Sequence, residues 1–507
     1  MEELTMSDPK TLTIVYTNDF HAQDKPVRAT WIEGSPMMGG AAYMATYINK
    51  VRKTEPNVLV LDAGDIITGP PISFLTNGEA PVDLYNSIGF DASCVGNHEF
   101  DHGVPNARKL IAQAQFPFLS GSIFYKGTNI LFAKPYEIIE KGSLKIGIIG
   151  IHGKKAGYET IQVDLVKELE FREQESLLQE YVNLLRPHVD LVIVLAHEGV
   201  PAEQSTTDRD VNVEEDFEED VRMCNNVKGI DLMITGHAHK SIVKPYVASE
   251  TGTLLCSTRG LGTFVGYLKL QVDQAEKKII SYEGHLEPIY TDQIEPDPIV
   301  AERVEYWDNR LKELIDEKIG YAEHNLSRNY FGESLLGNIV TDAVRLHTGA
   351  DAAFTAPGGL RADIDEGEIT VGHVINAVPF NNNILVMEMT GHELKKVLEQ
   401  SAGMTAGVLE QSGVEMIVDP SANKGCQVIE ATINGKPLQE GHIYKIASDD
   451  FTCKGGDGFT AFLKGRNIRD TSLIMRDIVI NYIRKTGHIN NVIEERVKFN
   501  ESVSSSS

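Results

Sequence analysis

The feature that most constrains the fold is a repeated unit in the first half of the chain: a short β-branched apolar run, then a polar cluster, then a helical segment. The apolar runs are TLTIVYTND, NVLVLDAGD, GFDASCVGNHE, LKIGIIGIHG, VDLVIVLAHEG and IDLMITGHAH. Such runs are typical of buried strands in a sheet that is covered by helices. Helices are predicted between them, for example over residues 39–54 and 172–186. Because α/β proteins place ligands at the carboxyl ends of such strands, the polar clusters are candidate site residues.

The length of 507 residues is too great for one ordinary domain. Polar strand-end clusters stop near residue 240, whereas Gly-rich, Phe and Arg motifs appear only after residue 350. The stretch PIVAERVEYWDNRLKELIDEKI has helical period and mixed charge, which predicts a connecting helix. We therefore expect an α/β chain with a first domain over 1–295, a linker helix over 296–320, a second domain over 321–497 and a disordered tail over 498–507.

The net charge of −26 argues against nucleic acid or an anionic membrane as a partner. It does not exclude a phosphate substrate, because a cationic metal pocket can lie within an acidic surface. The acidic segment 203–222 could itself hold a cation, but a solvated loop and helix is the favoured interpretation.

The compartment is predicted from cysteine usage and from the start of the chain. The five cysteines are odd in number and lack CxxC spacing, which indicates reduced, mostly structural thiols. The N-terminal stretch has no basic and apolar regions of a signal peptide, so a cytoplasmic location is expected, although a removed leader would look the same. No apolar run approaches the roughly 18 residues that a membrane span needs.

The polar residues that end the apolar runs share one property, which is that each offers an oxygen or nitrogen ligand to a cation. They are Asp19, His21, Asp65, Asn97, His98, His197, His237 and His239. A single histidine is usually a satisfied core or surface group, but so many ligands at successive strand ends indicate a metal centre. Hydrolytic chemistry here would use two divalent cations that share a bridging carboxylate. No cysteine belongs to the set, which favours Mn²⁺, Zn²⁺ or Fe over a thiolate site.

Spacing adds a geometric expectation. Asp19 with His21, and His237 with His239, are two residues apart, so on an extended strand end each pair would point to one side of the backbone. Asp65 follows a glycine, where close backbone packing would bring its carboxylate to a bridging position.

The blocks TNDFH, DAGD, GNHEFDHG, AHEG and TGHAH resemble, in this order, those of the calcineurin-like metallophosphoesterases, and with the second half of the chain they resemble the 5′-nucleotidase family. The resemblance implies a four-layer α/β/β/α metallophosphoesterase domain followed by an α/β 5′-nucleotidase substrate domain. It implies two cation sites, one formed by Asp19, His21, Asp65 and His239 and the other by Asp65, Asn97, His197 and His237. Close nucleotidase relatives often have Gln at the position of His239.

The same resemblance gives His98 a catalytic role instead of a ligand role. Its imidazole would face the transferred phosphoryl group, and Asp101 would orient it and favour its cationic form. For Glu99, two interpretations stay open, a hydrogen bond in the outer shell of the metal centre and a solvated turn.

Three stretches of the second half, APGGLRADIDEGEIT, AVPFNNNILVMEMTGHELKKVLEQ and SDDFTCKGGDGF, resemble blocks of the nucleotidase C-terminal domain. Arg361 is the candidate for binding an anionic group of the substrate. Phe380 and Phe451 are candidates for stacking on a base, with core packing as the competing interpretation. Asn382 would read the base edge and Asp457 would accept from ribose hydroxyls.

Two departures from the family pattern concern the substrate. The usual NGGGIR is here APGGLR. Leu326 and Tyr330 stand where some relatives have two more phosphate-binding arginines, and only Arg328 lies nearby.

The expected function is a dinuclear metal-dependent phosphoric ester hydrolase of nucleotide catabolism, 5′-nucleotidase-like, working by in-line attack of a hydroxide that bridges the cations. A 2′,3′-cyclic-nucleotide phosphodiesterase, a UDP-sugar pyrophosphatase and an enzyme for non-nucleotide phosphates stay open as alternatives. A catalytically silent nucleotide-binding protein is the alternative of another class, and the intact ligand set argues against it. The native metal and the oligomeric state, monomer or dimer, stay open.

Overall fold

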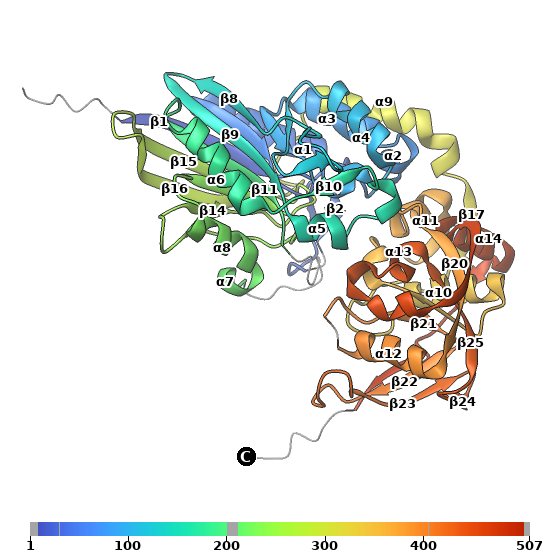
Figure 1. Ribbon diagram of the computed structural model, residues 1–507. Helices are drawn as coiled ribbons and strands as arrows, with labels where there is room; N and C mark the ends of the chain where they lie inside the picture. Colours follow the sequence, from blue (N-terminus) through green and yellow to red (C-terminus); the bar gives the residue numbers. More distant parts are fainter. Residues whose placement is uncertain (1–8, 30, 200–210, 404, 501–507) are drawn as a thin grey trace, which may run out of the picture. The chain divides into compact units, whose positions relative to one another are not determined.

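The computed structural model describes residues 9–29, 31–199, 211–403 and 405–500 (Figure 1). The protein is a two-domain α/β chain whose two compact units divide between Arg310 and Leu311. The division falls within helix α9 (Pro298–Ile315). The domain limits at residues 295 and 321 stay predictions.

The first unit contains two six-stranded sheets. The first sheet has the order β16 (Lys278–Pro288), β15 (Phe264–Asp273), β1 (Lys10–Thr17), β4 (Val58–Asp62), β5 (Ala92–Cys94) and β6 (Phe118–Leu119). The second has the order β13 (Tyr246–Val247), β14 (Leu254–Cys256), β12 (Leu232–Gly236), β11 (Leu191–His197), β9 (Leu144–His152) and β8 (Tyr136–Lys141). In both sheets the central strands are parallel, which includes β1 with β4 and β11 with β12. Their carboxyl ends therefore meet at one edge of each sheet, where the polar clusters follow.

The sheets of the first unit form the two inner layers of a four-layer arrangement. One apolar core contains residues of both sheets, among them Ile14 of β1 and Ile193 of β11, so the sheets pack face to face. The outer face of the first sheet packs against α1 (Ala41–Thr54), α3 (Glu79–Ile88) and α4 (Gly103–Gln113). The outer face of the second packs against α6 (Gln174–Leu185) and α8 (Glu218–Asn226). The α/β/β/α order implied by the resemblance is confirmed.

Helix α1 illustrates why these segments form helices that pack on the sheets. Its buried residues Ala41, Met44, Ile48 and Val51 recur at three or four positions, which places them on the face that contacts the sheet. The helices predicted over 39–54 and 172–186 are present as α1 and α6, shorter by one or two residues at some ends.

The remaining elements of the first unit are short. They are β2 (Val27–Arg28), β3 (Met37–Met38), α2 (Pro71–Leu75), β7 (Ile123–Tyr125), α5 (Lys154–Glu159), β10 (Leu169–Phe171) and α7 (Val213–Asp216), with short 3₁₀ turns at His98–Phe100 and Val163–Leu165.

The second unit is built around a five-stranded sheet, ordered β21 (Glu410–Ser412), β18 (Ala352–Thr355), β25 (Ile443–Asp449), β20 (Asn383–Thr390) and β26 (Arg466–Ile474). Two smaller sheets join β19 (Gly367–Thr370), β17 (Lys318–Ala322) and β27 (His488–Ile489), and β24 (Lys436–Pro437), β23 (Val428–Ile433), β22 (Val414–Val418) and β28 (Val497–Phe499). Its helices are α10 (Leu335–Thr348), α11 (Val371–Ala377), α12 (Gly391–Ala402), α13 (Asp450–Cys453) and α14 (Met475–Thr486), with 3₁₀ turns at Pro357–Gly359, Gly456–Gly458 and Thr460–Lys464.

Side-chain caps fix where two of these helices begin. The hydroxyl of Ser334 accepts from the backbone N–H of Gly337 at the start of α10. Thr390 and Glu393 form a reciprocal capping box at the start of α12.

The cysteines of the structure are all unpaired thiols, four of them buried and Cys426 exposed. Across the part of the chain that the structure describes, no helix combines the length and apolar character needed to cross a bilayer.

Candidate active site

Five of the predicted metal ligands lie in left-handed turns just beyond the ends of strands. They are Asp19, His21, Asp65, His237 and His239, with φ values of 49°, 48°, 58°, 73° and 52°. The expectation that each two-residue pair lies on an extended strand end is therefore wrong. The strands end at Thr17 and Gly236, and the chain then turns back over the sheet edge. Positive φ costs energy for residues with a Cβ, and such strain concentrates at functional sites.

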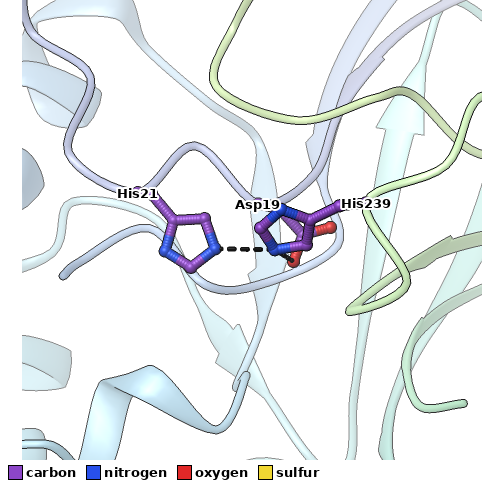
Figure 2. Close-up of side chains that lie close together, drawn as sticks. All are labelled: Asp19, His21 and His239. Atoms are coloured by element: carbon purple, nitrogen blue, oxygen red, sulfur yellow. Dashed lines mark hydrogen bonds and ion pairs between the residues drawn. The ribbon is translucent and has the colours of Figure 1, made fainter. Parts of the chain in front are cut away.

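The first cluster consists of Asp19, His21 and His239, whose side chains point toward one another (Figure 2). His21 Nε2 lies 2.9 Å from His239 Nε2, and His239 Nε2 lies 3.5 Å from Asp19 Oδ1. All three are buried. His21 Nδ1 lies 2.8 Å from the carbonyl oxygen of Thr68, and a proton donated there leaves Nε2 with its lone pair toward the cluster.

The second cluster consists of Asp65, His197 and His237, with Asn97 beside it. His197 Nε2 lies 3.1 Å from Asp65 Oδ2 and 3.0 Å from Asn97 Oδ1. His197 Nδ1 faces the carbonyl oxygen of Ala63 at 2.8 Å, and this contact orients Nε2 toward Asp65 and Asn97. The structure thus brings together residues that are far apart in the sequence.

Asp65 connects the two clusters. Its Oδ2 lies 3.1 Å from His197 Nε2 and 3.9 Å from His21 Nε2. Gly64 permits this approach, because a Cβ at that position would lie 2.9 Å from His197 Nδ1, and its φ of +89° suits glycine. Burial raises the pKa of Asp65, but the surrounding histidines, with His197 first, outweigh it and hold the pKa well below its usual value. Asp65 is therefore an anion placed between two groups of nitrogen donors.

The donor set fits two divalent cations. His237 Nε2 is buried and has no hydrogen-bond partner among the described residues. Burial, together with the nearby His197, lowers the pKa of His237 well below its usual value, so the ring is neutral and its lone pair is free for a cation. Nitrogen and carboxylate donors without a thiolate suit Mn²⁺, Zn²⁺ or Fe.

His98 lies beside these clusters and is held by Asp101. His98 Nδ1 is 2.8 Å from Asp101 Oδ2, which also accepts a hydrogen bond of 2.6 Å from the Thr68 hydroxyl. The other ring nitrogen, Nε2, lies 4.0 Å from Asp65 Oδ2. The ring therefore presents Nε2 toward the centre, which is the orientation implied for a group that contacts a phosphoryl oxygen.

The five substrate candidates of the second unit are all half-buried, so their side chains remain partly accessible to a ligand; they are Arg361, Phe380, Asn382, Phe451 and Asp457. Two local groupings are visible. Asp457 Oδ2 would lie 3.3 Å from a Cβ on Gly358, which places it beside the turn that leads to Arg361. Asn382 Nδ2 lies 3.5 Å from Asp449 Oδ1 at the start of the helix that contains Phe451. Arg328 is engaged by Asp363 at 2.9 Å.

The two units match known protein families. Residues 12–241 match the calcineurin-like phosphoesterases, and residues 318–464 match the 5′-nucleotidase C-terminal domain. The human 5′-nucleotidase is 28% identical over 96% of this chain and 91% of that protein. A snake venom 5′-nucleotidase from Naja atra is 29% identical over 96% of this chain and 98% of that protein. The crystal structure of a 5′-nucleotidase precursor from Thermus thermophilus has the same fold, with a TM-score of 0.82 at 24% identity over 97% of this chain and 100% of that chain.

The chain belongs to the 5′-nucleotidase family. It is a 5′-nucleotidase-like metallophosphoesterase, and the calcineurin-like family to which its first domain belongs implies a dinuclear metal site at the clusters described above.

In this member of the 5′-nucleotidase family, Glu99 is a buried hydrogen-bond acceptor next to Asp65. Its carboxylate accepts from the backbone N–H groups of Gly96 at 2.6 Å, Ile66 at 2.9 Å and Asp65 at 3.2 Å. Glu99 is only 2% exposed, so the solvated-turn interpretation is wrong and the hydrogen-bond interpretation agrees with the structure. It ties together the two loops that present Asp65 and Asn97.

Sequence reasoning missed Arg476, a buried arginine at the start of α14. It is 4% exposed, and burial lowers its pKa to about 10. Its guanidinium donates to the carbonyl oxygen of Pro379 and to Asn381 Oδ1, both at 3.1 Å. It therefore anchors the loop that contains Phe380 and Asn382. In the sequence it resembles any charged residue on an amphipathic helix, and no local signal marks it.

Proposed function

We propose that this protein releases phosphate from nucleotides, with nucleoside 5′-monophosphates as the first class of substrate. The observation that carries the proposal is the pair of buried His/Asp clusters that share Asp65. Support comes from 5′-nucleotidases that are similar along nearly the whole chain.

The proposed ligands are those of the two clusters, with Asn97 added to the second. Two divalent cations bound there would neutralise charge on the phosphoryl oxygens and lower the pKa of the attacking water. Asp65 would contact both cations. Glu99 would keep the loops of Asp65 and Asn97 at a fixed separation, because its carboxylate accepts hydrogen bonds from backbone N–H groups of both loops.

His98 has the proposed catalytic role. With its Nδ1 proton donated to Asp101, a protonated ring can donate from Nε2 to a phosphoryl oxygen. Phosphoryl transfer depends mostly on positioning and on stabilisation of charge that builds up on the equatorial oxygens. A charge-assisted hydrogen bond that is already oriented strengthens as this charge develops.

The nucleotide part of the proposal depends on the second unit. Arg361 offers a guanidinium for an anionic group, Phe380 and Phe451 offer flat rings, and Asn382 and Asp457 offer polar groups. The fold alone does not determine the substrate, since a sulfate thiohydrolase from Thermus thermophilus has a similar fold, with a TM-score of 0.77 at 19% identity.

The test is a phosphate-release screen of the metal-reconstituted protein against nucleoside mono-, di- and cyclic phosphates and UDP-sugars. The proposal expects nucleoside 5′-monophosphates to have the highest kcat/KM. Preference for 2′,3′-cyclic nucleotides or for UDP-sugars would reassign the substrate, and no turnover with added Mn²⁺ would favour a nucleotide-binding protein without catalysis.

A further inference from the structure

Thr68 lies beside the two His/Asp clusters, in the loop between β4 and α2, and its backbone is strained. Its φ is +69°, a left-handed conformation that branched side chains rarely adopt. The residue is buried, with 7% of its surface exposed. Strain of this kind persists where the surrounding contacts over-determine the conformation, and it concentrates at functional sites. The contacts of Thr68 therefore indicate which function the conformation serves.

Three hydrogen bonds hold Thr68 in this conformation, and each uses a different atom. Its N–H donates to Ser73 Oγ at 2.9 Å, and Ser73 is itself fully buried. Its carbonyl oxygen lies 2.8 Å from His21 Nδ1, and its hydroxyl donates to Asp101 Oδ2 at 2.6 Å. One residue therefore contacts a proposed metal ligand through its backbone and the partner of His98 through its side chain.

The hydroxyl of Thr68 reaches the same carboxylate oxygen that holds the His98 imidazole. His98 Nδ1 lies 2.8 Å from Asp101 Oδ2, so this oxygen faces the ring and the hydroxyl together. A carboxylate rotates easily about its terminal bond, because that torsion has a broad energy profile. The side chain of Asp101 is 21% exposed, so packing alone does not fix it. The hydrogen bond from the buried hydroxyl restricts this rotation.

The carbonyl oxygen of Thr68 has a parallel effect on the metal-binding side. Metal-binding histidines usually donate their other ring N–H to such an acceptor, and the contact orients the ring. The rings of His21 and His98 are neighbours, with centroids 5.1 Å apart and planes at 72°. Gly69 lets the loop lie this close, because a Cβ there would come within 2.2 Å of the His21 carbonyl oxygen. Thr68 is thus connected to both rings of the pair.

We propose that Thr68 is a positioning residue, which holds the His98 ring in the orientation for phosphoryl transfer through its hydroxyl and Asp101. This role rests on the proposed function of the site. The hydroxyl is assigned to His98 and the carbonyl oxygen to His21, so a side-chain substitution separates the two contacts. Loss of the hydroxyl should reduce turnover and leave metal retention unchanged, because the backbone contact to His21 remains.

A purely structural role of the hydroxyl predicts a different outcome. If the hydroxyl only stabilised the loop, its loss would weaken metal binding through His21. It would also reduce turnover by the same factor whether or not His98 is present. If the hydroxyl acts through His98, its effect disappears once the imidazole is removed. A double-mutant cycle therefore distinguishes the two roles.

The kinetic test compares Thr68→Val, Thr68→Ser and the control Thr76→Val in the full-length, metal-reconstituted protein. Valine keeps the branched shape and removes the hydroxyl, whereas serine keeps the hydroxyl. Thr76 is a suitable control because its hydroxyl donates to the carbonyl oxygen of Ile72, within the same loop region. We expect kcat to fall about tenfold in Thr68→Val with KM and bound metal unchanged, since contacts that orient a site residue from outside typically contribute about 10- to 100-fold. Thr68→Ser should retain most of the turnover, and Thr76→Val should match the wild type.

The double-mutant cycle places Thr68→Val in the His98→Asn background. There it should reduce kcat by less than about twofold, since the group that it orients is absent. A further tenfold loss in that background would show that Thr68 acts elsewhere and would overturn the proposal. Loss of bound metal in Thr68→Val, or an equal loss of kcat in Thr68→Ser, would overturn it too.

The orientation of the His98 ring gives a readout that does not depend on turnover. Crystal structures of the chelated wild type and of Thr68→Ser should show one ring orientation in contact with Asp101. Thr68→Val should show a displaced or second orientation, and an unchanged ring would overturn the proposal. If the wild type hydrolyses no phosphate ester, the proposed function fails, whereas the ring orientation still decides the role of Thr68.

Discussion

Replacement of His98 by asparagine tests the proposed catalytic hydrogen bond. The imidazole is held by Asp101 at 2.8 Å and is 13% exposed at its side chain, so its orientation is set before substrate arrives. An asparagine side chain at this position could not carry a positive charge and would not reach as far. Removal of one such oriented donor typically costs about 10²–10³ in kcat, or roughly 2.7–4 kcal/mol. We expect kcat to fall by about that factor while KM changes little.

The assay measures kcat, KM and metal content on the same preparation of His98→Asn, because His98 Nε2 also lies 4.0 Å from Asp65 Oδ2. Asp101→Asn serves as the matched comparison and should cost less, since it only loosens the orientation and charge of His98. Loss of a cation in His98→Asn would show that the residue is a ligand. Nearly unchanged kcat would show that it is a structural turn residue, and either result would refute the reasoning.

Three further predictions concern buried ionisable groups. The Glu99 carboxylate accepts hydrogen bonds from three backbone N–H groups, whereas the amide in Glu99→Gln has only one oxygen. We expect this substitution to lower the free energy of unfolding by about 3 kcal/mol, as measured by denaturation, and to weaken metal retention, as measured by metal analysis. Arg476→Met should loosen the loop at 379–382 and so raise KM for a nucleotide about tenfold, which corresponds to ~1.4 kcal/mol. A tenfold loss of turnover on p-nitrophenyl phosphate as well would contradict this prediction. Burial raises the pKa of Glu410 from 4.5 to about 8, so the stability from its protonated form is present at low pH and is lost as the pH rises through about 8. Glu410→Gln should therefore gain stability relative to the wild type by ~1.4 kcal/mol per pH unit between about pH 5 and 8, and a difference that does not depend on pH would disprove the assignment.

Much of the fold could be predicted from local sequence. The β-branched runs became the central parallel strands of two sheets, and the helix predicted over 39–54 became α1. These predictions succeed because a buried strand or helix face requires apolar residues at a characteristic spacing, and this spacing is visible in the sequence. The four-layer order came from the family resemblance, since no run by itself indicates which sheet it joins.

The candidate active site could be predicted in composition but not in geometry. The ligand types and their places at strand ends came from the sequence, but the left-handed turns at Asp19 and His237 did not, because neither residue is a glycine that would mark positive φ. Contacts between residues far apart in the sequence could not be predicted either. The acceptor role of Glu99 and the loop contact of Arg476 depend on tertiary packing, as does the burial of Asp220 within an acidic segment. The solvated character predicted for that segment is therefore wrong at this residue, and the first residues of the segment lie outside the described part of the chain.

The central claim is that two cations bridged by Asp65 carry out phosphate ester hydrolysis. The most direct test measures bound metal per chain and the rate of phosphate release from a nucleoside 5′-monophosphate, side by side, as metal is added back to the chelated wild type and to Asp65→Asn. We expect wild-type activity to appear as the second equivalent binds. Asp65→Asn should retain at most one cation and little activity. Full activity with one cation or none, or an Asp65→Asn protein that binds two cations and hydrolyses the nucleotide at the wild-type rate, would contradict the account.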